Sequence, residues 1–364
     1  MSDDLKNWID KIPGKNELKF SLDRTGLYTV DDLLRGYQGT QESYLATYDQ
    51  VAYKWFFDTE TNKPWPRSLE EAIGARVHDA EIQNGIDEFL ATDSNLAVGF
   101  MGGHGMKRDS VGYRQVAIMA RELRKANFKI ITGGGPGAME AANLGAFLAG
   151  YEYADLDEQL AVLKDKELTL KDSTQWLNAA LKVKRSLLDS SDGIPPPLSS
   201  NLGIPCWLYG NEPPNVFATA IGKYFYNSVR EDGLVTLASG GLIFAEGGGG
   251  TVQEVFQNAC VNFYAQKPIG SYPTTPMAFL GEDVWNPDMT KNDVPIGHVP
   301  VIPLLMKLAK DAILAAPPFP EQIFTSDDPQ MIVQFLIGQR DKRKVGQESL
   351  AERLLTRRMM LHQS

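Results

Sequence analysis

The feature that most constrains the fold is a repeated unit in which an apolar strand ends in glycine and a helix follows. Three such strands occur, at residues 95–103 (NLAVGFMGG), 129–135 (KIITGGG) and 240–248 (GGLIFAEGG). A helical pattern follows each of them, and the second helix opens with Pro136, a residue favoured in a first helical turn. Strands that alternate with helices in this way predict an α/β fold with a doubly wound, Rossmann-like parallel sheet.

This alternation extends over residues 91–340, which we interpret as one Rossmann-like domain. Residues 1–90 are predicted to form a helical extension that packs on this domain or on a second subunit. Residues 155–215 are predicted to be a helical insertion, with an irregular Pro- and Gly-rich loop at 192–205. The basic tail at 341–364 is expected to be helical, either as a solvated end or as an oligomer contact.

Finer predictions concern the second half of the domain. Residues 206–210 (CWLYG) suggest a short strand, and residues 217–239 suggest one long helix. A further helix is predicted over 251–265, and its apolar face makes Cys260 a core thiol. The residues of that face recur at helical spacing: Val252, Val255, Phe256, Ala259, Cys260 and Phe263.

Composition narrows the function classes. The formal net charge of −10 over 364 residues disfavours a broad nucleic-acid-binding surface, which needs clustered Lys and Arg. Two cysteines and four scattered histidines are too few for a disulfide framework or a metal site. The N-terminal residues MSDDLKNWID lack a signal pattern, and no apolar run is long enough to span a membrane. We therefore expect a cytoplasmic protein without a metal or other cofactor.

Glycine at the strand ends indicates where a ligand would bind. In a doubly wound sheet, ligands bind beyond the C-terminal ends of the strands. Glycine lets the backbone approach a ligand closely, and the unpaired N–H groups at the start of the next helix suit a phosphate. The glycines concerned are Gly102 and Gly103, then Gly133, Gly134 and Gly135, and then the quartet Gly247 to Gly250.

Glu254 has two interpretations from spacing alone. Thr251-x-x-Glu254 matches a capping box, in which Thr251 caps the helix and Glu254 bonds back to the N-terminal amide. Such a cap stabilises a helix by about 1 kcal/mol. The other interpretation places Glu254 in a ligand site beside the glycine quartet.

Two segments carry a resemblance to a known family. GGGPGAMEAANLGA (133–146) and GGGGTVQE (247–254) resemble the paired motifs of the Lonely Guy-type nucleotide phosphoribohydrolases. These are often mislabelled lysine decarboxylases, and they include larger purine/pyrimidine nucleotide 5′-monophosphate nucleosidases. The likeness covers residues 95–340 in element order, and Arg230 matches the family's arginine upstream of the glutamate. The length of this chain places it nearer the larger nucleosidases.

The resemblance implies hydrolysis of a nucleoside 5′-monophosphate to free base and ribose 5-phosphate by a homodimer or higher homo-oligomer. It implies that Glu254 is catalytic rather than a cap, with Arg230 orienting it or contacting the substrate. His104 is expected to contact or assist the base, or else to be a loop residue bonded to backbone, and no general acid can be identified. The resemblance implies that Gly248, Gly249, Gly250 and Thr251 bind the phosphate, and that Gly102, Gly103, His104, Gly133, Gly134, Gly135 and Met139 bind the rest of the nucleotide.

Departures from the family pattern keep an alternative open. Glu246 replaces the family's proline, and a carboxylate within about 4 Å of a phosphate would repel it by a few kcal/mol. Glu231 replaces a lysine next to the arginine. A non-catalytic nucleotide or molybdenum-cofactor carrier of the same fold is therefore the second hypothesis. A lysine decarboxylase is disfavoured because Lys107 is the only lysine in or beside the glycine loops, and a dehydrogenase because the Gly-x-Gly-x-x-Gly pattern is incomplete.

Overall fold

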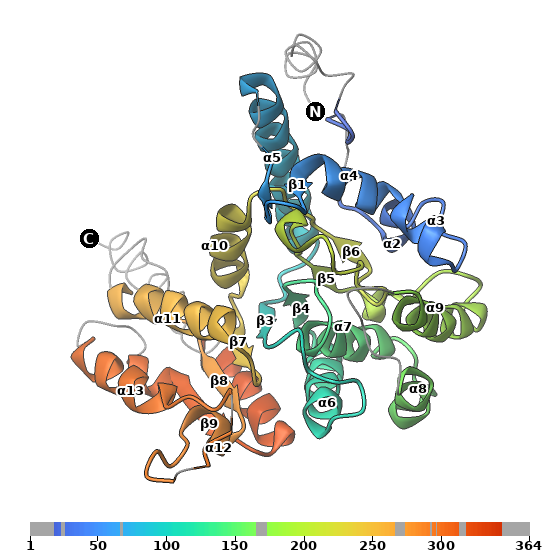
Figure 1. The fold of residues 1–364 in the computed structure, drawn as a ribbon. Helices are drawn as coiled ribbons and strands as arrows, with labels where there is room; N and C mark the ends of the chain where they lie inside the picture. The colour runs from blue at the N-terminus through green and yellow to red at the C-terminus, as the bar shows by residue number, and fades with distance from the viewer. Residues whose placement is uncertain are drawn as a thin grey trace, which may run out of the picture.

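The centre of the computed structural model is a seven-stranded sheet in which all neighbouring strands are parallel. From edge to edge the order is β6-β5-β4-β3-β7-β8-β9 (Figure 1). The strands are β3 (Ala97–Met101), β4 (Lys129–Thr132), β5 (Leu202–Gly203), β6 (Ala220–Ile221), β7 (Gly241–Phe244), β8 (Met277–Leu280) and β9 (Ile323–Ser326). The structure describes residues 18–22, 26–65, 68–164, 173–265, 274–291, 293–295, 297–312 and 318–343.

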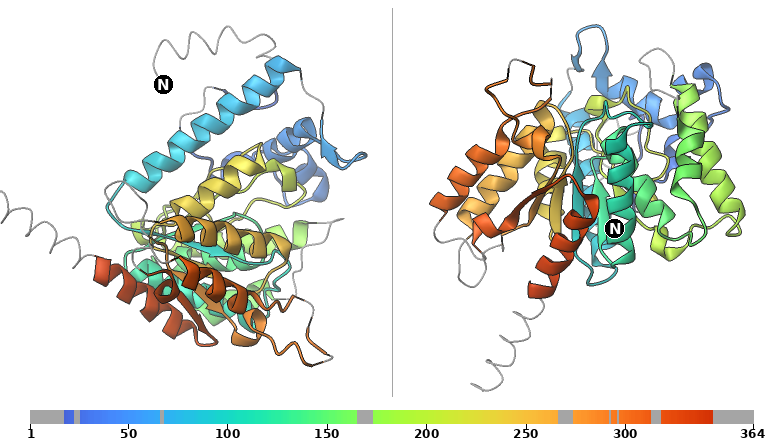
Figure 2. Two further views of the ribbon diagram at one scale, coloured as in Figure 1. Left: turned by 90° about the vertical axis from the view of Figure 1, so that its left-hand side faces the viewer. Right: turned by 90° about the horizontal axis from the view of Figure 1, so that it is seen from below.

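Helices cover both faces of this sheet, so the predicted α/β, Rossmann-like fold is confirmed (Figure 1 and Figure 2). One face carries α6 (Val111–Lys125) and α7 (Ala138–Leu148). The other carries α10 (Asn227–Leu237), α11 (Gly249–Tyr264) and α13 (Val301–Asp311). The short helices α12 (Glu282–Trp285) and η4 (Phe319–Gln322) and a helix over residues 329–343 complete the domain.

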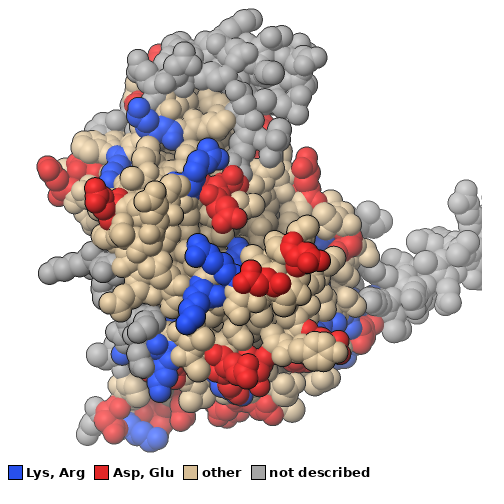
Figure 3. Space-filling view, turned by 90° about the vertical axis from the view of Figure 1, so that its right-hand side faces the viewer, with Lys and Arg blue, Asp and Glu red and all other residues tan. Residues whose placement is uncertain are grey.

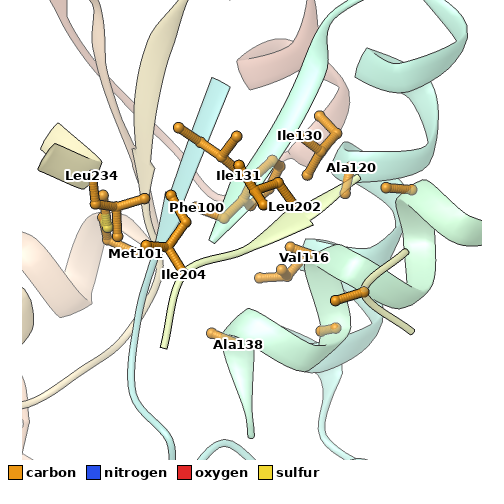
Figure 4. Packing of buried hydrophobic residues seen from close by; sticks show 14 of the residues in the cluster. Phe100, Met101, Val116, Ala120, Ile130, Ile131, Ala138, Leu202, Ile204 and Leu234 are labelled. Atoms are coloured by element: carbon orange, nitrogen blue, oxygen red, sulfur yellow. The ribbon is translucent and has the colours of Figure 1, made fainter. Parts of the chain in front are cut away.

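The core lies between the sheet and these helices. Helix α6 is amphipathic, and its buried stripe, which includes Val116 and Ala120, packs on the apolar strand β4 (Figure 4). Ser110 caps this helix by accepting a hydrogen bond from the amide of Tyr113. Helices α6 and α7 approach closely at Gly145, where a Cβ atom would lie 2.0 Å from the carbonyl oxygen of Ala117. On the other face, Leu234 of α10 lies next to Met101 of β3 in the core (Figure 4).

The strand order reverses between β3 and β7. The chain adds β4, β5 and β6 on one side of β3, and then returns to place β7 on the other side. Val98 of β3 is therefore in register with both Ile130 of β4 and Gly241 of β7. A crevice forms at such a switch point because the connections leave the two central strands in opposite directions.

The described part of the N-terminal extension packs on the main domain. Tyr28 and Ile221 of edge strand β6 exchange two backbone hydrogen bonds of 2.9 and 2.7 Å. Behind them Trp207 and Phe225 stack, with ring centroids 4.4 Å apart, and Phe20 joins the same aromatic cluster. The elements are α2 (Val30–Leu33), α3 (Gln41–Leu45), α4 (Tyr48–Phe56), the hairpin β1 (Phe57–Asp58) and β2 (Lys63–Pro64), and the long helix α5 (Leu69–Ala91).

The region 155–215 contains helices α8 (Leu156–Leu163) and α9 (Thr174–Asp189), as expected of a helical insertion. It also contains strand β5, because Leu202 pairs with Ile131 of β4. The prediction of an irregular loop throughout 192–205 was therefore wrong. Two residues of strand between prolines and glycines give almost no periodic signal. Residues 165–172 of the predicted insertion and residues 344–364 of the predicted tail lie outside the described residues.

Two further predictions are corrected. Residues 206–210 contain the 3-10 helix η3 (Trp207–Tyr209) rather than a strand. The predicted helix over 217–239 begins only at Asn227, because Ala220 and Ile221 form β6. At both places tertiary packing overrides local preference. The aromatic side chains of these segments, Trp207, Tyr224 and Phe225, belong to the hydrophobic core beneath the N-terminal segment.

Helix α11 buries most of the predicted face: Val255 and Ala259 are buried, and Val252, Phe256 and Phe263 are partly buried against the core. Its buried positions are Thr251, Val255, Asn258, Ala259 and Asn262. Cys260 is exposed, so its prediction as a core thiol was wrong. The cause is specific polar bonding, because the Asn262 side chain is buried and exchanges hydrogen bonds of 2.9 and 2.7 Å with the backbone of Thr275.

Candidate functional site

The three glycine loops meet at the switch point. The amide of Gly103, after β3, donates a 2.8 Å hydrogen bond to the carbonyl of Glu246, after β7. The amide of Ala138, at the start of α7, donates to the carbonyl of Gly103 at 3.2 Å. Between the loops lies a cleft of about 1090 Å³. It is lined by every residue that the sequence proposes for the site: Gly102, Gly103, His104, Gly133, Gly134, Gly135, Met139, Arg230, Gly248, Gly249, Gly250, Thr251 and Glu254.

The first loop is fixed by a buried ion pair. Arg108 donates through Nε and Nη2 to the two carboxylate oxygens of Glu140 in α7, at 3.0 and 2.5 Å. Its Nη1 donates to the carbonyl of Trp176 in α9, and the guanidinium lies over the Trp176 ring. Planar bidentate pairing of this kind fixes geometry as well as charge. The loop that carries Gly102 to His104 is therefore held to both α7 and α9 through Arg108.

A buried polar network holds the second loop. Gly134 has a φ of +71°, a conformation that favours glycine, and its amide donates to the hydroxyl of Thr132. That hydroxyl donates to the side chain of Asn143, which is also bonded to Asn201 and Asn215. Since each of these side chains is buried, the network leaves loop 133–135 little freedom.

The glycine quartet has two different physical roles. A Cβ atom at Gly247 would lie 2.2 Å from the Thr251 hydroxyl, so close packing requires glycine there. At Gly248, Gly249 and Gly250 a Cβ would meet no described atom within 4 Å, and none of the three has a positive φ. Neither crowding nor backbone conformation requires these three glycines, although alanine at Gly249 and Gly250 would stabilise the helix more. What they provide is open space above the backbone.

The quartet also forms the start of α11. The helix begins at Gly249, with Gly248 as its N-cap and no side-chain capping bond. The capping box considered for Thr251 and Glu254 therefore does not form. The first amides of the helix have no acceptor within it, and they belong to residues that line the cleft at the positive end of the helix dipole. Such an arrangement can bind a phosphate without any basic side chain.

Arg230 and Glu254 form an ion pair beside this helix start. Arg230 Nη1 lies 3.8 Å from Glu254 Oε1, and the two side chains are 9% and 14% exposed. Asn227 accepts hydrogen bonds from Arg230 Nε and Nη2 at 3.1 and 2.8 Å. Glu231 also lies 3.8 Å from the guanidinium. The arginine is thus held by its own helix and directed at the cleft.

Burial disfavours the ionised form of Glu254. Desolvation raises the pKa of Glu254 to about 7, Arg230 opposes the rise, and Glu231 adds to it. Burial therefore opposes the preference of a helix N-terminus for an ionised carboxylate. Glu254 lies a full turn beyond the helix start, where the dipole has weakened and burial dominates. A carboxyl with such a pKa can exchange a proton near neutral pH.

Sequence reasoning missed two charged residues in the cleft wall. Lys223 is buried, lines the cleft, and donates to Asp49 of helix α4 at 2.6 Å. Glu212 also lines the cleft with 22% of its side chain exposed, and burial raises its pKa. Neither belongs to a motif. The only available signal was a lysine inside the aromatic run 217–226, since a charge at a buried position is rarely found without a partner.

The remaining predicted residues lie at the rim. His104 is 74% exposed, and its Nδ1 is 3.7 Å from Glu212 Oε1, so it faces a side chain and not only backbone. Glu246 is also exposed, and its carboxylate reaches towards Gly297 on the opposite side of the cleft. Met139 stands between Gly133 and Gly135 and fills the space below them.

The described residues on one face of the molecule carry mixed charge. On the face shown in Figure 3, lysine and arginine side chains are interspersed with aspartate and glutamate. Within the described residues, no group of three or more potential ligands is placed to hold a metal ion. No helix in the same part of the chain combines the length and apolar character needed to cross a bilayer. Comparison of the sequence with protein-family models gives no match, and comparison with curated proteins gives none either.

Proposed function

We propose that this protein hydrolyses the N-glycosidic bond of a nucleoside 5′-monophosphate and releases free base and ribose 5-phosphate. The observation that carries the proposal is the open space over Gly248, Gly249 and Gly250, next to the Arg230–Glu254 pair. The resemblance of residues 133–146 and 247–254 to the Lonely Guy-type phosphoribohydrolases points to the same reaction.

The phosphate would lie on the amides at the start of α11. Gly248, Gly249 and Gly250 admit it to the backbone, and the Thr251 hydroxyl is within the same part of the cleft. Glu254 is in the next turn of that helix. A ribose attached to the phosphate would therefore have its ring beside Glu254 and Arg230.

Glu254 would act on the sugar. Cleavage of the bond between base and ribose develops positive charge at C1′ and the ring oxygen, as in glycoside hydrolysis. The Glu254 carboxylate would stabilise that charge and accept a proton from the attacking water. Arg230 holds this carboxylate in place at 3.8 Å and can contact the phosphate or the ribose hydroxyls with its planar head.

The test is incubation of the purified protein with a panel of purine and pyrimidine nucleoside monophosphates, with free base measured by chromatography. Activity with at least one of them is expected. Glu254→Gln should lower it by about 10²- to 10⁴-fold, the usual contribution of acid–base catalysis. The control is Glu122→Gln on the exposed surface of α6, which should not change the rate. A Glu254→Gln variant as active as the control would contradict the mechanism.

A non-catalytic carrier of a nucleotide or a molybdenum cofactor is the second candidate. The exposed carboxylate of Glu246 at the cleft rim favours it, because a negative charge there weakens binding of a phosphate dianion. Tight binding of a nucleotide or pterin, with no base released during prolonged incubation, would support the carrier over the enzyme.

A further inference from the structure

Glu212 lines the same cleft as Arg230 and Glu254, next to the second glycine loop. Its Oε2 lies 3.1 Å from the position that a Cβ of Gly135 would take, while Arg230 Nη1 lies 3.5 Å from the corresponding position at Gly133. These two glycines are separated by one residue, so their Cα atoms are at most roughly 7 Å apart. Arg230 and Glu212 therefore approach the second glycine loop at two nearby positions, and both line the cleft together with Glu254.

Helix α4 of the N-terminal segment holds the loop that carries Glu212. Trp207, at the start of the loop, donates through its ring nitrogen to Asp49 at 3.0 Å. Gln50 donates to the carbonyl of Gly210 at 2.8 Å. Tyr53 packs so closely on Gly210 that a Cβ there would lie 2.3 Å from its ring. Contacts from Asp49, Gln50 and Tyr53 thus hold Trp207 and Gly210, which precede Glu212, against this helix.

The surroundings of Glu212 favour the neutral form of its carboxyl group. Lys223 is a buried cation in the same cleft wall, and Asp49 already pairs with it at 2.6 Å. His104 lies 3.7 Å away but is largely exposed to solvent. Burial is the largest influence on Glu212 and raises its pKa, while His104, Lys223 and Arg230 oppose the rise. Glu212 and Glu254 are thus two partly buried carboxyl groups that line one cleft, and glycoside hydrolysis uses a pair of carboxyl groups in this way.

We propose that Glu212 donates the proton that the leaving base requires, and that Gln50 of α4 is a positioning residue for it. The proposal rests on the proposed function. In this step the bond between C1′ and the base nitrogen breaks, its electron pair stays on the base, and the Glu212 proton neutralises that charge. Water oxygen bonds to C1′ and gives its proton to Glu254. Exchange with solvent then restores both carboxyl groups.

Leaving-group dependence tests this role. A nucleoside monophosphate needs a proton on its departing base, whereas 4-nitrophenyl ribofuranoside 5-phosphate releases a stable phenolate without one. Glu212→Gln should lower kcat for the nucleotide by about 10²- to 10⁴-fold. Its kcat for the nitrophenyl substrate should stay within about threefold of wild type, since only the proton donor is lost. Gln50→Met should show the same selective loss to a smaller degree, because it leaves the Gly210 carbonyl without its donor.

The controls separate this role from misfolding and from failure of the proposed function. Glu212→Gln should bind ribose 5-phosphate as wild type does. Glu254→Gln should lose activity with both the nucleotide and the nitrophenyl substrate. Equal loss of the two substrates in Glu212→Gln, or loss of neither, overturns the role of Glu212 while leaving the nucleosidase standing. If the wild-type protein cleaves neither substrate, the proposed function fails and the role of Glu212 fails with it.

Discussion

Arg230 Nη1 lies 3.8 Å from Glu254 Oε1, although strand β7 separates the helices that carry these residues. Helices α10 and α11 lie side by side on one face of the sheet, before and after β7 (Figure 1). The glycine loop at the end of β7 turns the chain back so that Glu254 meets the arginine of the preceding helix. The pair is thus a consequence of one strand–loop–helix unit, and its partial burial makes it sensitive to pH.

Stability should depend on pH through Glu254. Its folded-state pKa of about 7 is above the ordinary value of 4.5, so the folded protein binds this proton more tightly than the unfolded chain. The stabilisation is complete below pH 4.5 and is lost as pH rises through 7, by up to about 3 kcal/mol. The free energy of unfolding of Glu254→Gln, taken relative to that of wild type, should therefore be higher at pH 8 than at pH 4.5. Urea unfolding at both pH values measures this, and a constant difference would contradict it.

Activity should rise with pH over the same interval. The proposed step needs ionised Glu254, and the fraction in that form falls about tenfold per pH unit below its pKa. We expect kcat/KM for 4-nitrophenyl ribofuranoside 5-phosphate, which needs no proton from Glu212, to increase with unit slope up to about pH 7 and then level off. A profile that is already flat between pH 5 and 7 would show that another group, or an unshifted Glu254, controls the reaction.

Alanine in the glycine quartet should separate binding from folding. Gly250→Ala places a methyl group in open space on a helix, so it should raise the free energy of unfolding by a few tenths to about 1 kcal/mol. The same methyl should weaken binding of ribose 5-phosphate by at least about tenfold, or 1.4 kcal/mol. Gly247→Ala is the matched contrast, because its Cβ would overlap the Thr251 hydroxyl and destabilise the fold. Calorimetric titration measures the affinity, and an unchanged affinity in Gly250→Ala would show that the phosphate does not bind at this loop.

Removing the negative charge at the cleft rim should strengthen phosphate binding. Glu246→Gln is expected to tighten ribose 5-phosphate roughly two- to tenfold at low salt, a modest effect because the carboxylate is exposed. The gain should shrink at 0.5 M salt as ions screen the repulsion. Equal affinities at low salt would place the phosphate away from Glu246.

Breaking the buried ion pair under the first loop should be costly. Arg108→Met leaves the Glu140 carboxylate buried beside an apolar side chain, which typically destabilises a protein by about 3–5 kcal/mol. Arg114 pairs with Asp157 at 2.6 Å in an exposed position, so Arg114→Met should cost less than about 1 kcal/mol. Chemical denaturation of both variants checks the contrast, and comparable losses would contradict it.

The sequence by itself determined the layered architecture and the positions of the three glycine loops. Strand and helix periodicity, together with glycine at strand ends, are local signals, and they predict that the ends of β3, β4 and β7 share one edge of a parallel sheet. Because the ends of neighbouring parallel strands must be close in space, the residues proposed from these loops line one cleft. Arg230 was added by the family resemblance, since its own surroundings carry no motif.

Only the tertiary structure decided the rest of the cleft wall. Glu212, Lys223 and Asp49 are far apart in the sequence, and they meet because α4 packs under the loop that follows η3. The same packing turned residues 206–226 into a 3-10 helix and a short edge strand, against their local pattern. The raised pKa of Glu254 likewise follows from burial. The side-chain cap on α11 is missing because the helix begins at Gly249, two residues before Thr251. Desolvation and long-range packing depend on residues that no sequence window contains.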